Sequence, residues 1–132
     1  MPLHKLFHAT SLARKPAILR DGLQSGSCLT TCEDTAEYFG IEAMERDGCD
    51  DYVVFEVALP ECDLKVDYPA YEEPISTYYK KWAKDDRSWW EGIDSGSIPY
   101  PDNEYDTKTA LSVTTCVRAI HAVKPENLKE IR

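Results

Sequence analysis

The sequence lacks any long run of apolar residues, because no stretch of it approaches the roughly 20 residues that a helix needs to cross a bilayer. Its first residues also lack a charged and then apolar leader with a small-residue cleavage site. We therefore expect a soluble, cytoplasmic protein with no membrane partner. The chain has no internal repeat, low-complexity tract or linker, and 132 residues is the length of one domain, which predicts a single domain over 1–132.

Basic residues are also scarce. The chain has 15 Lys and Arg against 24 Asp and Glu, which leaves a formal net charge of −9. Nonspecific nucleic-acid binding and polybasic membrane anchoring both depend on Lys and Arg. The composition therefore makes nucleic acid a less favoured partner, and it favours a basic protein surface or a cationic small molecule.

Cysteine pairs with the spacing of a known motif are missing too. The five cysteines are an odd number at irregular spacings with no CxxC, which favours free thiols in a reducing compartment. Cys28 and Cys32 could hold zinc together with His8 or His121, but no second ligand pair has motif spacing. We predict no metal site.

The hydrophobic pattern alternates strand, helix, strand, helix and then continues mainly as strands, with the helices early and the sheet completed late. This order is typical of an α+β fold rather than a doubly wound parallel sheet. The expected strands cover 3–8, 26–31, 51–59, 63–68 and two within 109–123, broken near Cys116, and the expected helices lie within 11–21 and 32–44. Pro16 predicts a late start for the first helix. The segment 71–106, rich in aromatic and acidic residues, is expected to form a helix from Pro74 to about Lys84 and then a long loop.

Two groups of residues near the expected strand ends could address a ligand. His8 and Thr10 are two positions apart on a strand and so share one face. Thr30 and Thr31 precede a helix, whose N-terminus favours anionic ligands, and Tyr38 lies about two turns into that helix with a ring available for stacking. Each group also has a purely structural interpretation, namely a half-buried histidine with an N-cap threonine, and an aromatic residue in the core.

Four carboxylates follow the central strand. Carboxylates near a positive centre stabilise it and accept hydrogen bonds from sugar hydroxyls, although in so acidic a chain any single one can simply be solvated. We expect the last of them, Asp67, to be exposed. The four are Glu56, Glu61, Asp63 and Asp67.

The order and spacing of these groups resemble the ADP-ribosyltransferases of the diphtheria-toxin and poly(ADP-ribose) polymerase lineage. Residues 6–12 (LFHATSL) and 18–23 (ILRDGL) resemble the family's opening strand with His-Gly-Thr or similar, its helix and its Gly-Leu. Residues 29–38 (LTTCEDTAEY) resemble its second motif, a strand with Ser or Thr followed by a helix with Ala-x-Tyr. Residues 52–57 are similar to the small rifampicin ADP-ribosyltransferases, and 120–128 are similar to the closing strand of such families.

The resemblance implies a split β-sheet core with two early helices, and NAD as the substrate. In that case His8 binds the ribose beside the nicotinamide, Thr10 contacts the adenosine half and Tyr38 packs against the nicotinamide ring. With Thr31, these residues are expected to line one cleft. The sequence departs from the family at the second strand, where the usual tyrosine falls on Cys28 or Leu29.

The family's catalytic glutamate has no counterpart, because the corresponding stretch, 112–115, is SVTT. In the rifampicin-modifying branch an aspartate after the central strand does this work, and Asp67 matches that position best. Glu104 is the second candidate. The resemblance implies mono-ADP-ribosyl transfer to a protein, or to another macromolecular or small-molecule acceptor, with 71–106 facing the acceptor.

Three alternatives remain. One is a relative that hydrolyses NAD, and another is one similar to RNA 2′-phosphotransferases, which would need arginines for the phosphate that no matching motif supplies here. The third is a non-catalytic acidic interaction or inhibitor module, for which the aromatic segment 71–106 would supply the contact surface. An ordered NAD-shaped pocket would speak against this module.

Overall fold

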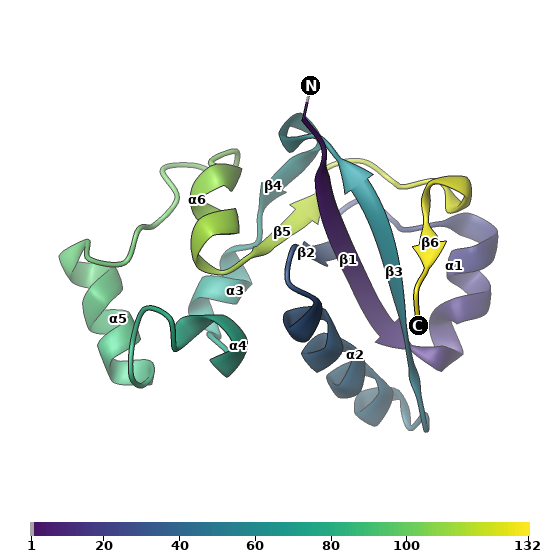
Figure 1. The fold of residues 1–132 in the computed structure, drawn as a ribbon, viewed down its shortest axis with the longest axis horizontal. Helices are drawn as coiled ribbons and strands as arrows, with labels where there is room; N and C mark the ends of the chain where they lie inside the picture. Colours follow the sequence, from purple (N-terminus) through teal and green to yellow (C-terminus); the bar gives the residue numbers. More distant parts are fainter. Residues whose placement is uncertain (1) are drawn as a thin grey trace.

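A computed structural model of the chain describes residues 2–132. It contains a six-stranded antiparallel sheet with the strand order β4-β5-β2-β1-β3-β6, and helices lie beside the sheet (Figure 1), so the α+β prediction is confirmed. The strands are β1 (His4–Ser11), β2 (Cys28–Thr30), β3 (Tyr52–Leu59), β4 (Leu64–Val66), β5 (Cys116–Ala119) and β6 (Lys129–Glu130).

The two early helices agree with the sequence pattern. A 3-10 turn (Leu12–Arg14) precedes α1 (Lys15–Asp21), and Pro16 occupies the first turn of α1, as its fixed φ favours. The long helix α2 (Glu33–Asp47) ends at Gly48, whose φ of 69° is left-handed. The later helices are α3 (Tyr68–Glu72), α4 (Ser76–Tyr79), α5 (Asp86–Ser95) and α6 (Thr107–Val113). None of the helices described for 2–132 is long and apolar enough to cross a membrane.

The strands β1 and β3 form the centre of the fold. They pair along the whole of β1, and their side chains alternate between the two faces of the sheet. Phe7 and Val54 pack against α2 on one face, and Leu6 and Phe55 lie in the larger core on the other. The helix approaches closely because Gly40 has no side chain, since a Cβ at that position would lie 2.4 Å from Cδ2 of Tyr52.

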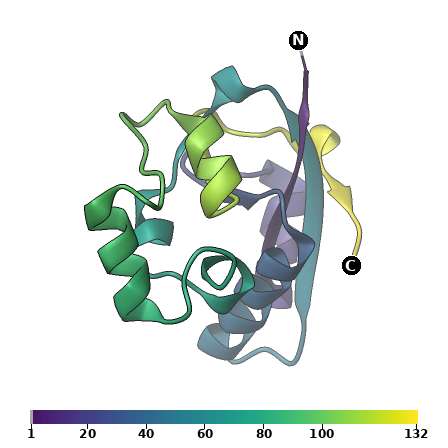
Figure 2. The same ribbon diagram turned by 60° about the vertical axis from the view of Figure 1, so that its left-hand side comes forward.

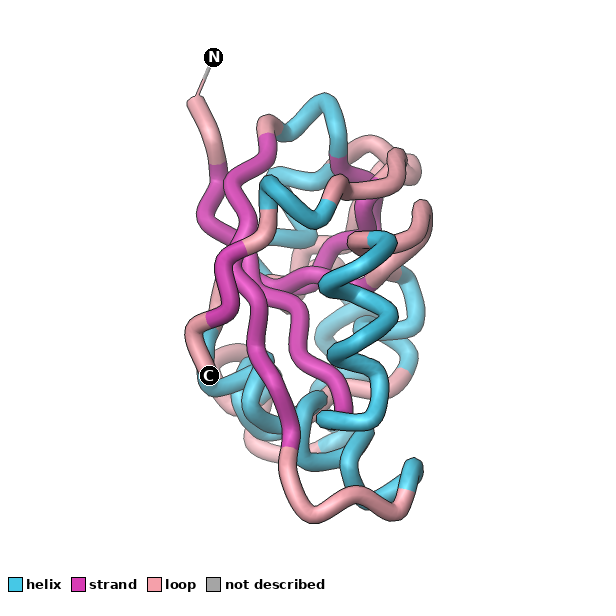
Figure 3. The backbone as a smooth tube through the Cα atoms, turned by 90° about the vertical axis from the view of Figure 1, so that its right-hand side faces the viewer, coloured by secondary structure: helices cyan, strands magenta, loops and turns pink. Residues whose placement is uncertain are grey.

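The sheet is nearly divided between β1 and β2. These two strands pair at one position only, Phe7 opposite Thr30, whereas β2 pairs with β5 along its whole length. On the edge of β1 that faces away from β3, no residue other than Phe7 pairs with a described strand. Figure 3 shows the strands from the side on which β6 lies, with the rest of the sheet behind. The separation of β1 from β2 leaves room for a cleft in the middle of the molecule.

The helices α3 to α6 form a second region beside the sheet, coloured from teal (α3) to yellow-green (α6) in Figure 2, and we call residues 67–115 the helical region. Its core is aromatic: Tyr71, Tyr78 and Trp89 are almost completely buried. The indole Nε1–H of Trp89 donates to the backbone oxygen of Tyr71 at 3.0 Å, and the Trp89 ring contacts both tyrosine rings. Aromatic burial therefore holds these short helices together.

Three expectations for this part of the chain are wrong. The long loop expected after Lys84, within 71–106, contains α5, which Asp85 and Ser88 start with a capping box. The helix expected over 74–84 shrinks to α4 followed by turns. The first strand expected within 109–123 is instead the second half of α6, which buries Ala110 and Val113.

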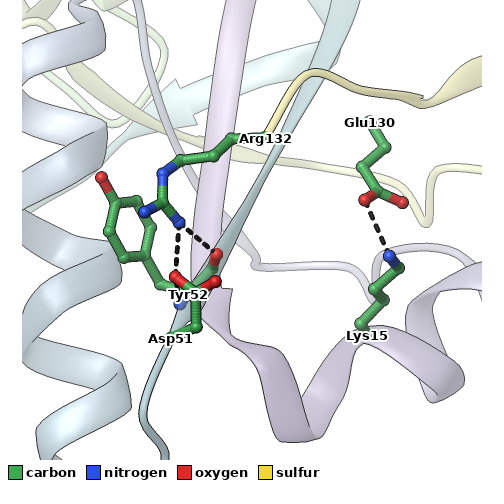
Figure 4. Close-up of polar contacts among 5 residues, drawn as sticks. All are labelled: Lys15, Asp51, Tyr52, Glu130 and Arg132. Atoms are coloured by element: carbon green, nitrogen blue, oxygen red, sulfur yellow. Dashed lines mark hydrogen bonds and ion pairs between the residues drawn. The ribbon is translucent and has the colours of Figure 1, made fainter.

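The segment after β5 returns to the sheet and ends at β3 (Figure 4). β6 pairs with β3, and the guanidinium of Arg132 lies 3.7 Å from the centre of the Tyr52 ring while it donates to Asp51 and to the backbone oxygen of Tyr52. The Lys15 ammonium donates to the Glu130 carboxylate at 2.8 Å. The last strand is thereby joined both to β3 and to α1.

Candidate functional site

A cleft of about 930 Å³ opens where β1 and β2 separate. Its walls come from β1, β2, α1, α2 and the beginning of the helical region. The volume is near the upper end of the range of roughly 300–1,000 Å³ that is usual for small-molecule sites. Four of the six predicted site residues line this cleft: His8, Thr10, Tyr38 and Asp67.

His8 presents a hydrogen-bond acceptor to the cleft. Its Nδ1 lies 2.7 Å from the backbone oxygen of Cys28, and because a carbonyl can only accept, Nδ1 carries the proton. Burial lowers the pKa of His8, so the ring is neutral at pH 7 and Nε2 keeps its lone pair. The sequence could not reveal this tautomer, because the partner is a backbone atom on another strand.

The threonines have separate roles. Thr10 lies within β1 rather than at a helix N-cap, is 6% exposed, and its hydroxyl makes no hydrogen bond to another described residue, so it is free to bond a ligand in the cleft. Thr31 is not among the residues that line the cleft; its backbone N–H donates to the backbone oxygen of Thr115 at 3.1 Å. The Thr30 hydroxyl also contacts the Thr115 hydroxyl, at 2.8 Å. These contacts join β2 to the turn before β5.

Tyr38 faces outward from α2, so its interpretation as a core aromatic residue is wrong. The side chain is 39% exposed, and the neighbouring Phe39 packs against the core instead. Partial burial, followed by the nearby carboxylates of Glu42 and Glu73, raises the pKa of the Tyr38 hydroxyl. The cleft therefore has an aromatic ring at its edge, with its hydroxyl in an acidic environment.

Asp67 lies deeper than expected. The sequence predicts an exposed carboxylate, but the residue is 4% exposed and its Oδ1 accepts from Nε of Arg118 at 3.1 Å. Arg118, from β5, also donates to the backbone oxygen of Gly26 and lines the cleft. An opposite charge held by hydrogen bonds makes the burial of a carboxylate tolerable, and no local pattern in the sequence marks this long-range partner.

Asp67 also affects the thiol beside it. Cys28 is exposed as a residue, and partial desolvation by its neighbours, followed by the negative charge of Asp67, raises the pKa of its thiol. A thiol with a raised pKa is a poor nucleophile at neutral pH. The carboxylate and the imidazole, rather than Cys28, are therefore the polar groups that the inner cleft offers to a ligand.

The remaining predicted carboxylates lie outside the cleft. Glu104 is exposed, and its backbone oxygen accepts from the backbone N–H of Val66 at 2.7 Å, so this part of the helical region adds to the edge of β4. Glu61 pairs with His4 at 3.0 Å and Glu56 with Lys5 at 3.9 Å. Asp67 is thus the one member of the predicted carboxylate set that a ligand in the cleft could meet.

A charged cluster lies where β1 and α2 end. Asp47 accepts hydrogen bonds from Arg14, at 2.9 Å, and from the Ser11 hydroxyl, and Arg46 lies 3.8 Å away. The hydrogen bond from Arg14, followed by that from Ser11, lowers the pKa of Asp47 to about 2. The cluster fixes the relative position of α2 and the 3-10 turn that leads into α1.

No family model matches this chain, and no curated protein or solved structure matches it. The similarity to ADP-ribosyltransferases therefore stays a prediction from the sequence. Within residues 2–132, no three His, Cys, Asp or Glu side chains form a group that could hold a metal ion.

Proposed function

We propose that this chain is an NAD-dependent ADP-ribosyltransferase, which binds NAD between the two halves of its split sheet and transfers ADP-ribose to a protein. The observation that supports the proposal is the cleft beside the unpaired edge of β1. Its lining combines a neutral histidine acceptor, an unpartnered threonine hydroxyl, an exposed tyrosine ring and a buried carboxylate. These are His8, Thr10, Tyr38 and Asp67.

Three of these groups have a part in binding NAD. Nε2 of His8 accepts a hydrogen bond from a ribose hydroxyl, which is the role that its neutral tautomer suits. The Thr10 hydroxyl serves a polar group on the adenosine half. The Tyr38 ring stacks on the flat nicotinamide.

In the transfer step, the bond between C1 of the ribose and the nicotinamide nitrogen breaks. The electron pair leaves with the nicotinamide, which departs as a neutral molecule, and positive charge develops on the ribose. The Asp67 carboxylate stabilises that charge. A nucleophile of the acceptor then bonds to C1, and its proton passes to Asp67. Arg118 acts as a positioning residue, because its hydrogen bond to Oδ1 fixes the carboxylate.

Binding is tested by the rise in melting temperature that millimolar NAD causes. We expect His8→Ala to weaken NAD binding by about fivefold to tenfold, the value of one hydrogen bond. His121→Ala is the matched control, because His121 is exposed and lies outside the main cleft. If NAD leaves the melting temperature of the unaltered chain unchanged, the proposal is wrong.

Turnover is tested with NAD labelled in the nicotinamide. Asp67→Asn should reduce nicotinamide release by about a hundredfold or more, the usual loss when a preorganised electrostatic group is removed, and change NAD affinity little. Glu104→Gln is the control, because Glu104 lies outside the cleft. If Glu104→Gln abolishes nicotinamide release and Asp67→Asn does not, Glu104 is the catalytic residue, and the class of enzyme is unchanged.

A non-catalytic NAD-binding or protein-binding module is the second candidate, and two observations favour it. Arg118 partly neutralises Asp67, and the family's glutamate position is occupied by 112–115 (SVTT). A carboxylate already paired with a guanidinium stabilises a new positive charge less strongly. NAD binding without release of nicotinamide or transfer of label would support this second candidate.

A further inference from the structure

The cleft has an acidic edge, and the three arginines that also line the cleft, Arg14, Arg46 and Arg118, are each paired with another carboxylate. Carboxylates from α2, from the end of α3 and from α5 line it, all of them on exposed residues. None forms an ion pair with a Lys, Arg or His anywhere in residues 2–132, in contrast to Asp47, Asp67 and Glu130. We call this set the acidic rim: Glu42, Glu72, Glu73 and Asp86.

Two exposed aromatic rings line the same cleft. Tyr38 is 39% exposed and Trp90 is 41% exposed, although Trp89 beside it on α5 is completely buried. Helix α5 thus buries one tryptophan in the core and presents the next to the cleft. The effect of Glu42 and Glu73 on the Tyr38 hydroxyl places ring and carboxylates close together.

Like charges without counter-charges repel one another and lower the stability of the folded chain. The exposed parts of the tryptophan and tyrosine rings likewise gain nothing from the fold while they remain in water. Both costs disappear when a cation occupies the space between them, because carboxylates pair with it and the faces of aromatic rings attract it. Arginine suits such a space better than lysine, because its planar guanidinium stacks on rings and forms paired hydrogen bonds with carboxylates.

We propose that the acidic rim, with Tyr38 and Trp90, docks an arginine-rich segment of a partner protein and presents one of its guanidinium groups to the cleft. A protein segment fits better than a single small cation, because the carboxylates are spread over three helices and each can meet a separate basic side chain. Charge complementarity with the net charge of −9 brings such a segment to this surface. The role of the segment as acceptor of ADP-ribose rests on the proposed function, whereas its docking does not.

The first test measures binding of a fluorescent oligoarginine peptide to the full chain by fluorescence anisotropy. We expect the peptide to bind and its affinity to fall as salt is added, because the Debye length shrinks from about 10 Å at 0.1 M to about 3 Å at 1 M. An oligocitrulline peptide of the same length has the same shape without the charge and should not bind. Equal binding of both peptides would overturn the proposal.

The second test separates the rim from the general acidity of the chain. Glu72→Gln combined with Glu73→Gln should weaken oligoarginine binding by about tenfold or more, as loss of central contacts does. The matched control, Glu45→Gln with Asp94→Asn, removes the same two charges at exposed positions outside the cleft and should weaken binding less than about threefold. Equal losses in the two double variants would mean nonspecific attraction, and the proposal would be wrong.

A third variant tests the ring at constant charge. Trp90→Ala should weaken oligoarginine binding by about threefold to tenfold, the range of a partly desolvated cation–π contact. NAD-induced stabilisation should persist in all these variants. Peptide binding without NAD binding would refute the proposed function and leave the docking surface in place. NAD binding with peptide affinity equal in every variant would refute the docking surface alone.

Discussion

The sheet with its two early helices and the helical region are stabilised in different ways. In the sheet, β1 pairs with β3 along its whole length, and side chains on both faces of these strands are buried, against α2 on one face and in the larger core on the other. In the helical region, no helix exceeds the 10 residues of α5, and three buried aromatic side chains supply the core. Isolated helices of this length are marginal in water. The helical region therefore depends on tertiary packing alone, whereas the sheet also has the continuous backbone pairing of its two long strands.

The two regions nevertheless share one hydrophobic core. Leu64 and Val117 of the sheet belong to the same buried cluster as Tyr71, Tyr78 and Trp89. Because the cluster is continuous, we expect the chain to unfold in a single cooperative transition rather than region by region. The predictions below test this expectation and the boundary between the regions.

The largest effect is expected from Trp89→Ala. Removal of a fully buried indole should lower the free energy of unfolding by about 3–5 kcal/mol. Urea denaturation followed by circular dichroism measures this loss, and Trp82→Ala, at a 39% exposed position, is the control with a small effect. Two separate transitions in the Trp89 variant would show that the helical region unfolds independently of the sheet.

A smaller effect is expected from the ion pair that links the regions. Asp67→Asn leaves Arg118 without its charged partner and should lower the free energy of unfolding by about 2 kcal/mol, the value of a charge-assisted hydrogen bond. Urea denaturation at neutral pH measures this loss in the free energy of unfolding. Glu104→Gln, which alters an exposed carboxylate of the same region, should change stability by less than about 0.5 kcal/mol. Similar values for the two variants would mean that the pair contributes nothing to joining the regions.

The smallest effect concerns the stability of the folded chain in acid, to which Asp47 contributes beside the sheet. The pKa of Asp47 is lowered from 3.8 to about 2 in the folded chain, so its contribution is complete above about pH 3.8 and is lost as pH falls toward 2. Thermal unfolding between pH 5 and pH 2 should therefore show a shallower decline for Asp47→Asn than for the unaltered chain. Asp50→Asn, at an exposed position without an ion pair among the described residues, should follow the unaltered chain. Parallel curves for all three proteins would contradict the role of Asp47.

The fold of the sheet with its two early helices could be predicted, because local sequence patterns determine these elements. The apolar run that forms β3 and the Gly48 stop of α2 are visible without any tertiary information. The helical region could not be predicted in the same way, because α5 and α6 owe their burial to residues far along the chain. One local signal was available: Asp85 and Ser88 have the spacing of a helix N-terminus.

The candidate site divides in a similar manner. The spacing of His8 and Thr10 on one strand, and the position of Tyr38 in α2, could be derived from local periodicity. The partner of Asp67 could not, since Arg118 lies 51 positions away and meets it only when β4 and β5 pair. The acidic rim could not be predicted either, because its carboxylates come together only through the packing of three helices.

The contacts of the last strand have a consequence for the order in which a newly made chain can mature. Lys15 at the start of α1 bonds Glu130, 115 positions later, and Leu23 just beyond α1 pairs with Val123. During synthesis, α1 emerges long before these partners, and contacts between distant positions are the slowest to form. The α1 wall of the cleft is therefore fixed only after residues 123–130 have left the ribosome. A nascent chain that already holds β1, α2 and β3 would lack this wall, which delays formation of the complete cleft until 123–130 have folded.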